Sequence, residues 1–301
     1  DLMSYIWIES SGIASVQQNS TGLYSNNAAS PTEFSLWIGG QKVSQLDSLF
    51  IQGVHNPLLR DSTAKASCAV TTNNAKANHG GDHYMIPFFF GEDYTKCLPL
   101  VALQYHDVEI RVKCRDGYTP TDTPKVWGNY VYLDTDERKF FTDTEHELLI
   151  TQTQHQLASN TDTEIDLTYF NHPVKSLHLV SGHASGNNWD DEYSFSKSSL
   201  YINGTALFED TSNVYHHTVI PEMHSTDLPD DVLEDLPTFT WPFCLNMSKM
   251  QPTGTLNFSR IDSSKLVLTN PTGGNALHRV YAVNYNILRI KNGMAGVAFG
   301  N

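Results

Sequence analysis

The strongest constraint on the fold is a strict alternation of apolar and charged residues at positions 107–114. Apolar side chains occupy the even positions from Val108 to Cys114, whereas the odd positions from Asp107 to Lys113 are charged. Successive side chains of a β-strand point to opposite faces, so this pattern predicts a strand with one face on a core and one face in water. The fold must therefore contain a half-exposed sheet.

The segment before this strand follows a different period. Apolar residues at positions 98, 101, 102 and 105 have the spacing of one helical face. The alternative is a strand with a bulge near His106. Pro99 favours the short helix, because proline is tolerated in a first helical turn but not in a central strand. We expect residues 84–90 and 107–114 to form adjacent strands, with this connector filling the end of their core.

Short segments of the same kind recur along the rest of the chain. A short helix is expected at residues 44–59. Strands are expected at residues 2–9, 34–43 (around a Gly39-Gly40 turn), 124–134, 147–157, 164–170, 173–181, 198–204, 239–247, 255–261, 265–270 and 278–290. Pro242 restricts residues 239–247 to the edge of a sheet. Many short strands without long helices predict an all-β sandwich or barrel, not an α/β enzyme fold.

The length of 301 residues suggests two domains of ordinary size. Residues 134–147 are charged and interrupt the strand pattern, so we divide the chain into residues 1–140 and 141–301. The second part has about eight expected strands and the first only about five. Because residue 1 opens directly into a strand, we expect upstream sequence, including the first strands of the first domain, to be missing from this segment.

Composition excludes several classes of function. A net charge of −14 disfavours binding to nucleic acid or to an anionic membrane, since both attract lysine and arginine. The sequence contains no run of 18 apolar residues that could span a bilayer. Its four scattered cysteines lack a C-x-x-C pair and read as free thiols in a reducing compartment.

No motif in the sequence has the composition and spacing of a catalytic or metal-binding site. His79 and His83 are separated by a Gly-Gly-Asp sequence that is a poor helix former, and His146-Glu147 lacks the second histidine of a zinc helix. His216-His217 would point to opposite sides of a strand. An acidic group lacks the spacing of a calcium loop: Asp230, Asp231, Glu234 and Asp235. We therefore predict no catalytic, cofactor-binding or metal-binding residue.

Four sequons match the acceptor pattern for N-glycosylation. Asn19 lies in an expected surface loop, and Asn203 follows an expected strand. Asn246 and Asn257 lie in or beside expected strands, where half-buried positions disfavour glycans. Asn19 and Asn203 are therefore the glycosylation candidates, although no secretory signal accompanies them.

Several long motifs resemble one protein family, the major capsid proteins of nucleocytoplasmic large DNA viruses. The similar segments are residues 39–43 (GGQKV), 86–112 (IPFFFGEDYTKCLPLVALQYHDVEIRV), 131–154, 170–180 (FNHPVKSLHLV), 202–209 (INGTALFE), 252–262 (PTGTLNFSRID) and 281–301. Ala206-Leu207 depart from the pattern, because arginine is more usual there. The motifs are ordered and cover nearly the whole chain, and they look most like algal-virus and iridovirus members.

This resemblance implies a double jelly roll, two eight-stranded antiparallel sandwiches in tandem, of which the first is incomplete at its N-terminus. It implies a homotrimer that forms a pseudo-hexagonal capsomer. Such capsomers contact neighbouring capsomers and minor capsid proteins and tile an icosahedral shell over an internal membrane that the chain does not span. The resemblance also implies assembly in the host cytoplasm, a place in the virion capsid, no direct contact with nucleic acid and no enzymatic activity.

Two other classes of function compete with the structural one. The first is a jelly-roll module that binds glycans in the manner of a lectin, which requires a shallow aromatic site. The second is an enzyme, either a glycoside hydrolase or a cupin-like metalloprotein.

Overall fold

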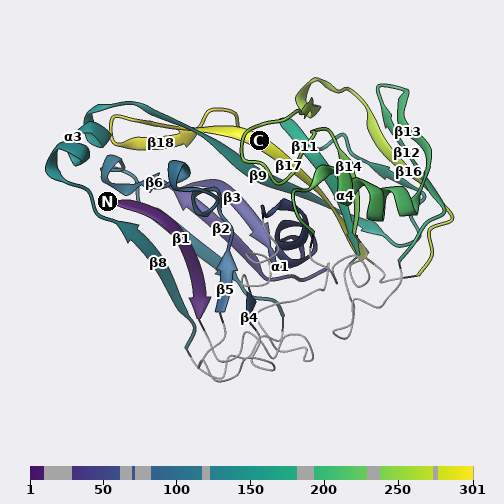
Figure 1. The fold of residues 1–301 in the computed structure, drawn as a ribbon, viewed down its shortest axis with the longest axis horizontal. Coiled ribbons are helices and arrows are strands. Elements are labelled where there is room, and N and C mark those ends of the chain that lie inside the picture. The colour runs from purple at the N-terminus through teal and green to yellow at the C-terminus, as the bar shows by residue number, and fades with distance from the viewer. Residues whose placement is uncertain are drawn as a thin grey trace.

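The structure is a computed structural model, and it describes residues 1–9, 29–61, 70–71, 83–116, 123–181, 193–228, 238–273 and 277–300. Its strands form two groups, one towards each end of the long axis (Figure 1). Each group buries its own apolar core. The molecule is thus built from packed antiparallel sheets, as the alternating patterns predict.

Two sheets form the amino-terminal group. One has the order β4 (Val70–Thr71), β5 (His83–Ile86), β1 (Leu2–Glu9) and β6 (Leu98–Pro99), and β8 (Lys125–Val131) also pairs with β1. The other has the order β3 (Gln41–Asp47), β2 (Glu33–Ile38) and β7 (Val108–Lys113). Alternate residues such as Ile6 and Ile8 on β1 and Phe34 and Leu36 on β2 are buried in one shared cluster.

Two further sheets form the carboxy-terminal group. One has the order β14 (Thr238–Pro242), β11 (Pro173–Ser181), β17 (Leu277–Lys291) and β18 (Met294–Val297), with β15 (Leu256–Asn257) paired to β11 and β9 (His146–Ser159) paired to β17. The other has the order β10 (Glu164–Asp166), β16 (Ser264–Thr269), β12 (Lys197–Ile202) and β13 (Thr205–Ser212). Leu177, Leu200 and Trp241 lie in the core between them.

The helical elements are short. They are α1 (Ser48–Phe50), which continues into a wider helical segment at Ile51–Leu59, α3 (Thr135–Asp143), and α4 (Ile220–His224), which follows a similar segment at Tyr215–Val219. Tight 3-10 turns occur at Phe89–Gly91, Tyr94–Lys96, Leu100–Ala102 and Phe258–Arg260. These elements connect sheets and close the ends of the cores.

Strand β17 lies between the two cores. It pairs with β9 along almost its whole length and with β11 on its other edge, and these long strands connect the two groups (Figure 1). Val280 and Ala282 are buried in the carboxy-terminal core, whereas Tyr281 and Val283 are buried in the amino-terminal core. One strand therefore contributes its two faces to two different cores, which explains why every residue from His278 to Asn286 is buried.

The alternating pattern at residues 107–114 is confirmed, but its predicted neighbour is wrong. Strand β7 alternates half-buried and exposed residues as expected. It pairs with β2, whereas β5 pairs with β1 and β4 in the other sheet. The connector between β5 and β7 crosses from one sheet to the other, so β5 and β7 cannot be adjacent.

That connector is also less regular than the short helix we predicted. It contains 3-10 turns and the two-residue strand β6, in which Leu98 pairs with Met3 and Pro99 with Leu2. Leu98 is fully buried and Leu103 is 8% exposed, so the connector does fill the end of the core. The apolar spacing there reflects burial in successive tight turns and not a single helical face.

Three other expectations need correction, and two elements were not expected. The unexpected elements are strand β13 at residues 205–212 and helix α3 within the charged segment at residues 134–147. The expected helix at 44–59 begins only after β3 ends at Asp47. The strand expected at 164–170 ends at Asp166. The strand expected at 239–247 ends at Pro242, and within the described strands it pairs only with β11, as expected for a sheet edge.

Replacement of Leu98 by alanine should lower the free energy of unfolding by about 2–5 kcal/mol, because it leaves a cavity in a fully buried site. Leu245→Ala is the matched control. Its side chain is 76% exposed, so the same deletion should change stability by less than about 0.5 kcal/mol. Urea unfolding of both variants gives the comparison, and equal midpoints would show that the packing of the connector is misassigned.

Candidate functional site

Buried histidines of the described chain are structural groups. His178 lies between two hydroxyls, with Nε2 2.8 Å from Ser176 Oγ and Nδ1 3.0 Å from Thr240 Oγ1. Burial lowers the pKa of His178 to about 3, so its ring is neutral at physiological pH. A neutral ring held by two hydroxyls in a core has no access to a substrate.

His216 and His217 cover the exposed edge of a sheet. They do not lie on a strand, as we predicted, but in the helical segment Tyr215–Val219. Their Nδ1 atoms lie 3.0 Å from the carbonyl oxygens of Thr240 and Thr238 on β14, so each ring donates a hydrogen bond to that strand. An unpaired edge strand invites association with other chains, and these histidines satisfy two of its carbonyls.

The other histidine motifs lie only partly within the described residues. His146 begins strand β9, and its Nε2 lies 2.9 Å from the carbonyl oxygen of Phe141. His83 lies on β5, whereas His79 and the acidic residues at 230–235 fall outside the described residues. Within the described part of the chain, no three His, Cys, Asp or Glu side chains gather closely enough to hold a metal ion.

Asn203 lies at an exposed turn between β12 and β13, with a left-handed φ of 48°. Its side-chain oxygen accepts hydrogen bonds from the backbone amides of Asp262 and Ser263 at 3.0 and 3.1 Å. Asn19 lies outside the described residues. Glycosylation of either asparagine stays a prediction.

The most strongly connected polar group is a buried ion pair where the two strand groups meet. Asp47 ends β3 and accepts a hydrogen bond from the backbone amide of Phe50 at 2.8 Å, which caps α1. The same carboxylate accepts from Arg279 Nη1 at 3.0 Å and from the Tyr281 hydroxyl at 2.7 Å. Asp47 and Arg279 are 2% and 3% exposed. Three elements thus converge on one carboxylate.

Tyr281 is a neutral hydrogen-bond donor in this group. Burial, and then the neighbouring Asp47 carboxylate, raise the pKa of Tyr281 well above its usual value. Arg279 and Tyr281 are two residues apart on β17 and therefore project from the same face, towards the amino-terminal core. Our sequence reasoning missed this group. The available signal was an arginine inside an otherwise apolar strand, which requires a buried partner.

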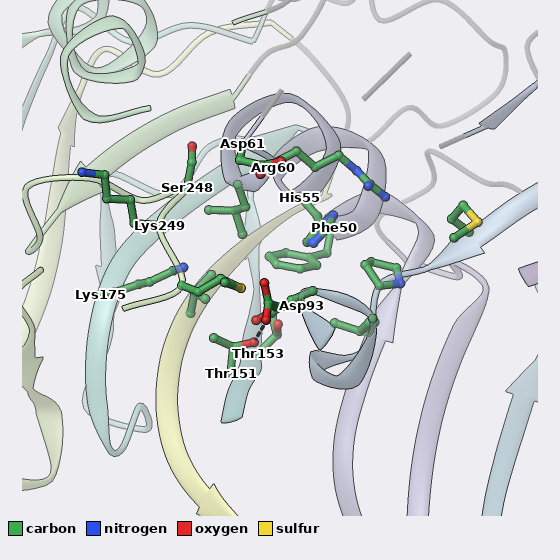
Figure 2. Close-up of a pocket in the computed structure, with 18 of the residues that line it drawn as sticks. Phe50, His55, Arg60, Asp61, Asp93, Thr151, Thr153, Lys175, Ser248 and Lys249 are labelled. Atoms are coloured by element: carbon green, nitrogen blue, oxygen red, sulfur yellow. Dashed lines mark hydrogen bonds between the residues drawn. The ribbon is translucent and has the colours of Figure 1, made fainter. Parts of the chain in front are cut away.

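A cavity of about 560 Å³ lies beside this ion pair, between the two strand groups. Phe50 and His55 come from the helical segment after β3, Thr151 and Thr153 from β9, and Lys175 from β11 (Figure 2). Burial is the main cause that lowers the pKa of His55 to about 3, so this ring is neutral. The lining combines apolar side chains with polar and charged ones, and its Lys175 amine has a pKa lowered mainly by burial, an arrangement suited to binding a small molecule.

Comparisons with known proteins point to a single family. Residues 137–296 match the family described as large eukaryotic DNA virus major capsid protein, and residues 27–134 match the family described as major capsid protein N-terminus. The major capsid protein of Pyramimonas orientalis virus is 32% identical, with 72% of this chain and 60% of that relative covered. The major capsid protein of Paramecium bursaria Chlorella virus 1 is 29% identical, with 71% and 65% covered. The chain therefore spans somewhat less than two thirds of these relatives.

Solved structures show the same architecture. PBCV-1 VP54 superposes with a TM-score of 0.74 at 24% identity, covering 100% of this chain and 90% of that one. The Faustovirus major capsid protein superposes with a TM-score of 0.65 at 11% identity, covering 96% and 74%. At these identities the likeness concerns the fold, which is an all-β double jelly roll.

Asp47→Asn should lower the free energy of unfolding by about 3–5 kcal/mol, because it leaves the buried Arg279 guanidinium without its carboxylate. The matched control is Glu147→Gln, which removes the acid from the exposed pair with Arg289 and should cost less than about 1 kcal/mol. Urea unfolding at pH 7 measures both variants. A loss for Asp47→Asn no larger than for Glu147→Gln would contradict the role of the buried pair.

Stability should fall when the pH drops from 7 to 5. Burial lowers the folded-state pKa of His55 and His178 to about 3 and of His216 and His278 to about 4. Their stabilisation is complete above the unfolded-state pKa of about 6.5 and is lost as the unfolded chain takes up protons below it. At pH 5 each histidine should have lost about 2 kcal/mol.

His178→Gln tests this account, because the amide retains two polar ends for Ser176 and Thr240 and does not titrate. Urea unfolding between pH 7 and 5 should show a shallower loss of stability in this variant than in the parent chain. A parent chain whose unfolding free energy is constant over that range would contradict the assignment of neutral buried histidines.

Proposed function

Because the chain belongs to the large eukaryotic DNA virus major capsid protein family, we propose that it is a structural protein of a virion shell. The family match over residues 137–296 carries this proposal, and the double jelly roll supports it. The matching family and relatives are capsid proteins, and they give no support to a glycan-binding module. Because these homologues are capsid proteins, we propose no catalytic role.

The proposed building block is a homotrimer. Each chain contributes two jelly rolls, so three chains present six similar sandwiches around one axis and form a pseudo-hexagonal capsomer. Capsomers of this outline tile a flat facet, and symmetry closes their contacts into an icosahedral shell. We propose contacts with neighbouring capsomers and with minor capsid proteins. Exposed aromatic side chains support such contacts, among them Trp127, Tyr130 and Tyr132 on or beside β8.

The charge of the chain bears on what lies inside the shell. A net charge of −14 disfavours direct contact with the genome, which fits an internal membrane between the shell and the nucleic acid. In the part of the chain that the structure describes, no helix is long and apolar enough to cross a bilayer. We propose that the chain lies outside such a membrane and that assembly takes place in the host cytoplasm.

We retain the division into residues 1–140 and 141–301 as a proposal for the two jelly rolls. Core residues support it only in part, because Ile150, Leu288 and Ile290 from the second segment pack in the amino-terminal core. Asn19 and Asn203 stay the proposed glycosylation positions.

The chain should form a stable trimer in solution, with a mass three times its own 33.7 kDa. Sedimentation velocity over a hundredfold dilution series measures this mass, and negative-stain images of the same sample should show a six-lobed outline. The Glu147→Gln variant, with an exposed change, provides a matched control. A monomer at every concentration would contradict the proposed capsomer.

A further inference from the structure

Lys175 carries a buried amine whose neighbours are a carbonyl and an aromatic ring, with Nζ 5.8 Å from the centre of the Tyr285 ring. The residue is 5% exposed, and its Nζ donates a hydrogen bond to the carbonyl oxygen of Met247 at 2.9 Å. An ammonium group has three N–H donors, and within the described residues the structure gives this one no salt bridge. A buried charge without a countercharge is costly, so this position calls for an anion.

The carboxylate that acts on Lys175 most strongly is already occupied. Burial lowers the pKa of Lys175 below its ordinary value, and the negative charge of Glu92 acts in the opposite direction by favouring the charged form. One Glu92 oxygen pairs with Lys96 Nζ at 2.6 Å, and the other accepts from the Thr151 hydroxyl at 2.5 Å. Both Glu92 oxygens are thus engaged by other residues, and within the described residues no ion pair joins Glu92 to Lys175.

Lys175 points into the cavity between the two strand groups (Figure 2). Leu46, Phe50 and Val283 contribute apolar side chains to the lining, which also contains the charged residues Arg60, Glu92 and Asp93. Asp61, Lys249 and Gln251 at the rim are exposed, so the cavity opens to solvent there. A volume of about 560 Å³ lies within the range of small-molecule sites.

We propose that this cavity binds a single-chain aliphatic carboxylate, such as a fatty acid. The carboxylate pairs with the Lys175 ammonium, and the alkyl chain lies against Leu46, Phe50 and Val283. A cationic amphiphile would meet the same buried ammonium and be repelled, and an uncharged one would leave it unpaired. Because the walls belong to both strand groups, a bound chain would also join them. This site does not depend on the proposed shell role.

Calorimetric titration of the delipidated chain with decanoate, decanol and decyltrimethylammonium, all below their micellar concentrations, tests the headgroup preference. Decanoate should bind with a dissociation constant below about 1 mM and at least about tenfold more tightly than the other two. Lys175→Met keeps an apolar side chain of similar length and should weaken decanoate binding at least about tenfold while leaving decanol unchanged. Lys197→Met, which removes an exposed lysine from β12, should have no effect.

Thr153→Phe places a larger side chain in the cavity from β9 and should abolish binding of decanoate and decanol together. This variant and the headgroup comparison on the parent chain decide the question if Lys175→Met does not fold. The proposal is overturned if decanoate does not bind the parent chain. It is also overturned if decanoate binds no better than the cationic probe, or binds folded Lys175→Met or Thr153→Phe as tightly as the parent.

Discussion

The structure depends on strand β17, whose two faces are buried in two different cores. Its alternate side chains supply Tyr281 and Val283 to one core and Val280 and Ala282 to the other, while β9 and β11 satisfy its backbone on both edges. A strand in this position cannot shift register by one residue without exchanging every side chain between the cores. The two jelly rolls are therefore not independent units joined by a linker, because strand β17 contributes side chains to the cores of both.

The buried arginine of β17 is tolerated because it has a defined partner. Arg279 would be unacceptable inside an apolar strand without Asp47, which also caps α1 and accepts from Tyr281. The carboxylate thus connects the end of β3, the start of a helix and β17. At the far edge of the same sheet, His216 and His217 satisfy carbonyls of β14 and cover an edge that would otherwise invite pairing with another chain. A shell protein needs both properties, rigidity inside and controlled association outside.

Sequence reasoning predicted most strands, because period-two alternation reports local burial directly. It also identified the family from motifs. It failed where distant pairing decides the outcome: β5 and β7 are close in sequence and lie in different sheets. Asp47 and Arg279 are separated by 232 residues, and no local pattern joins them. The helix α3 was predictable, since Asp134 and Glu137 form a capping box whose spacing is visible in the sequence. Strand β13 was missed because its exposed residues resemble a loop.

Because the two cores share strand β17, we expect them to unfold cooperatively. Pulsed hydrogen exchange across a urea titration, read by mass spectrometry, reports the unfolding midpoint of each peptide separately. Because β17 belongs to both cores, peptides from β2 in the amino-terminal group and from β12 in the carboxy-terminal group should lose protection at one common midpoint, together with β17. Separate midpoints for β2 and β12, with β17 following only one of them, would contradict the account of a single unit built on a shared strand.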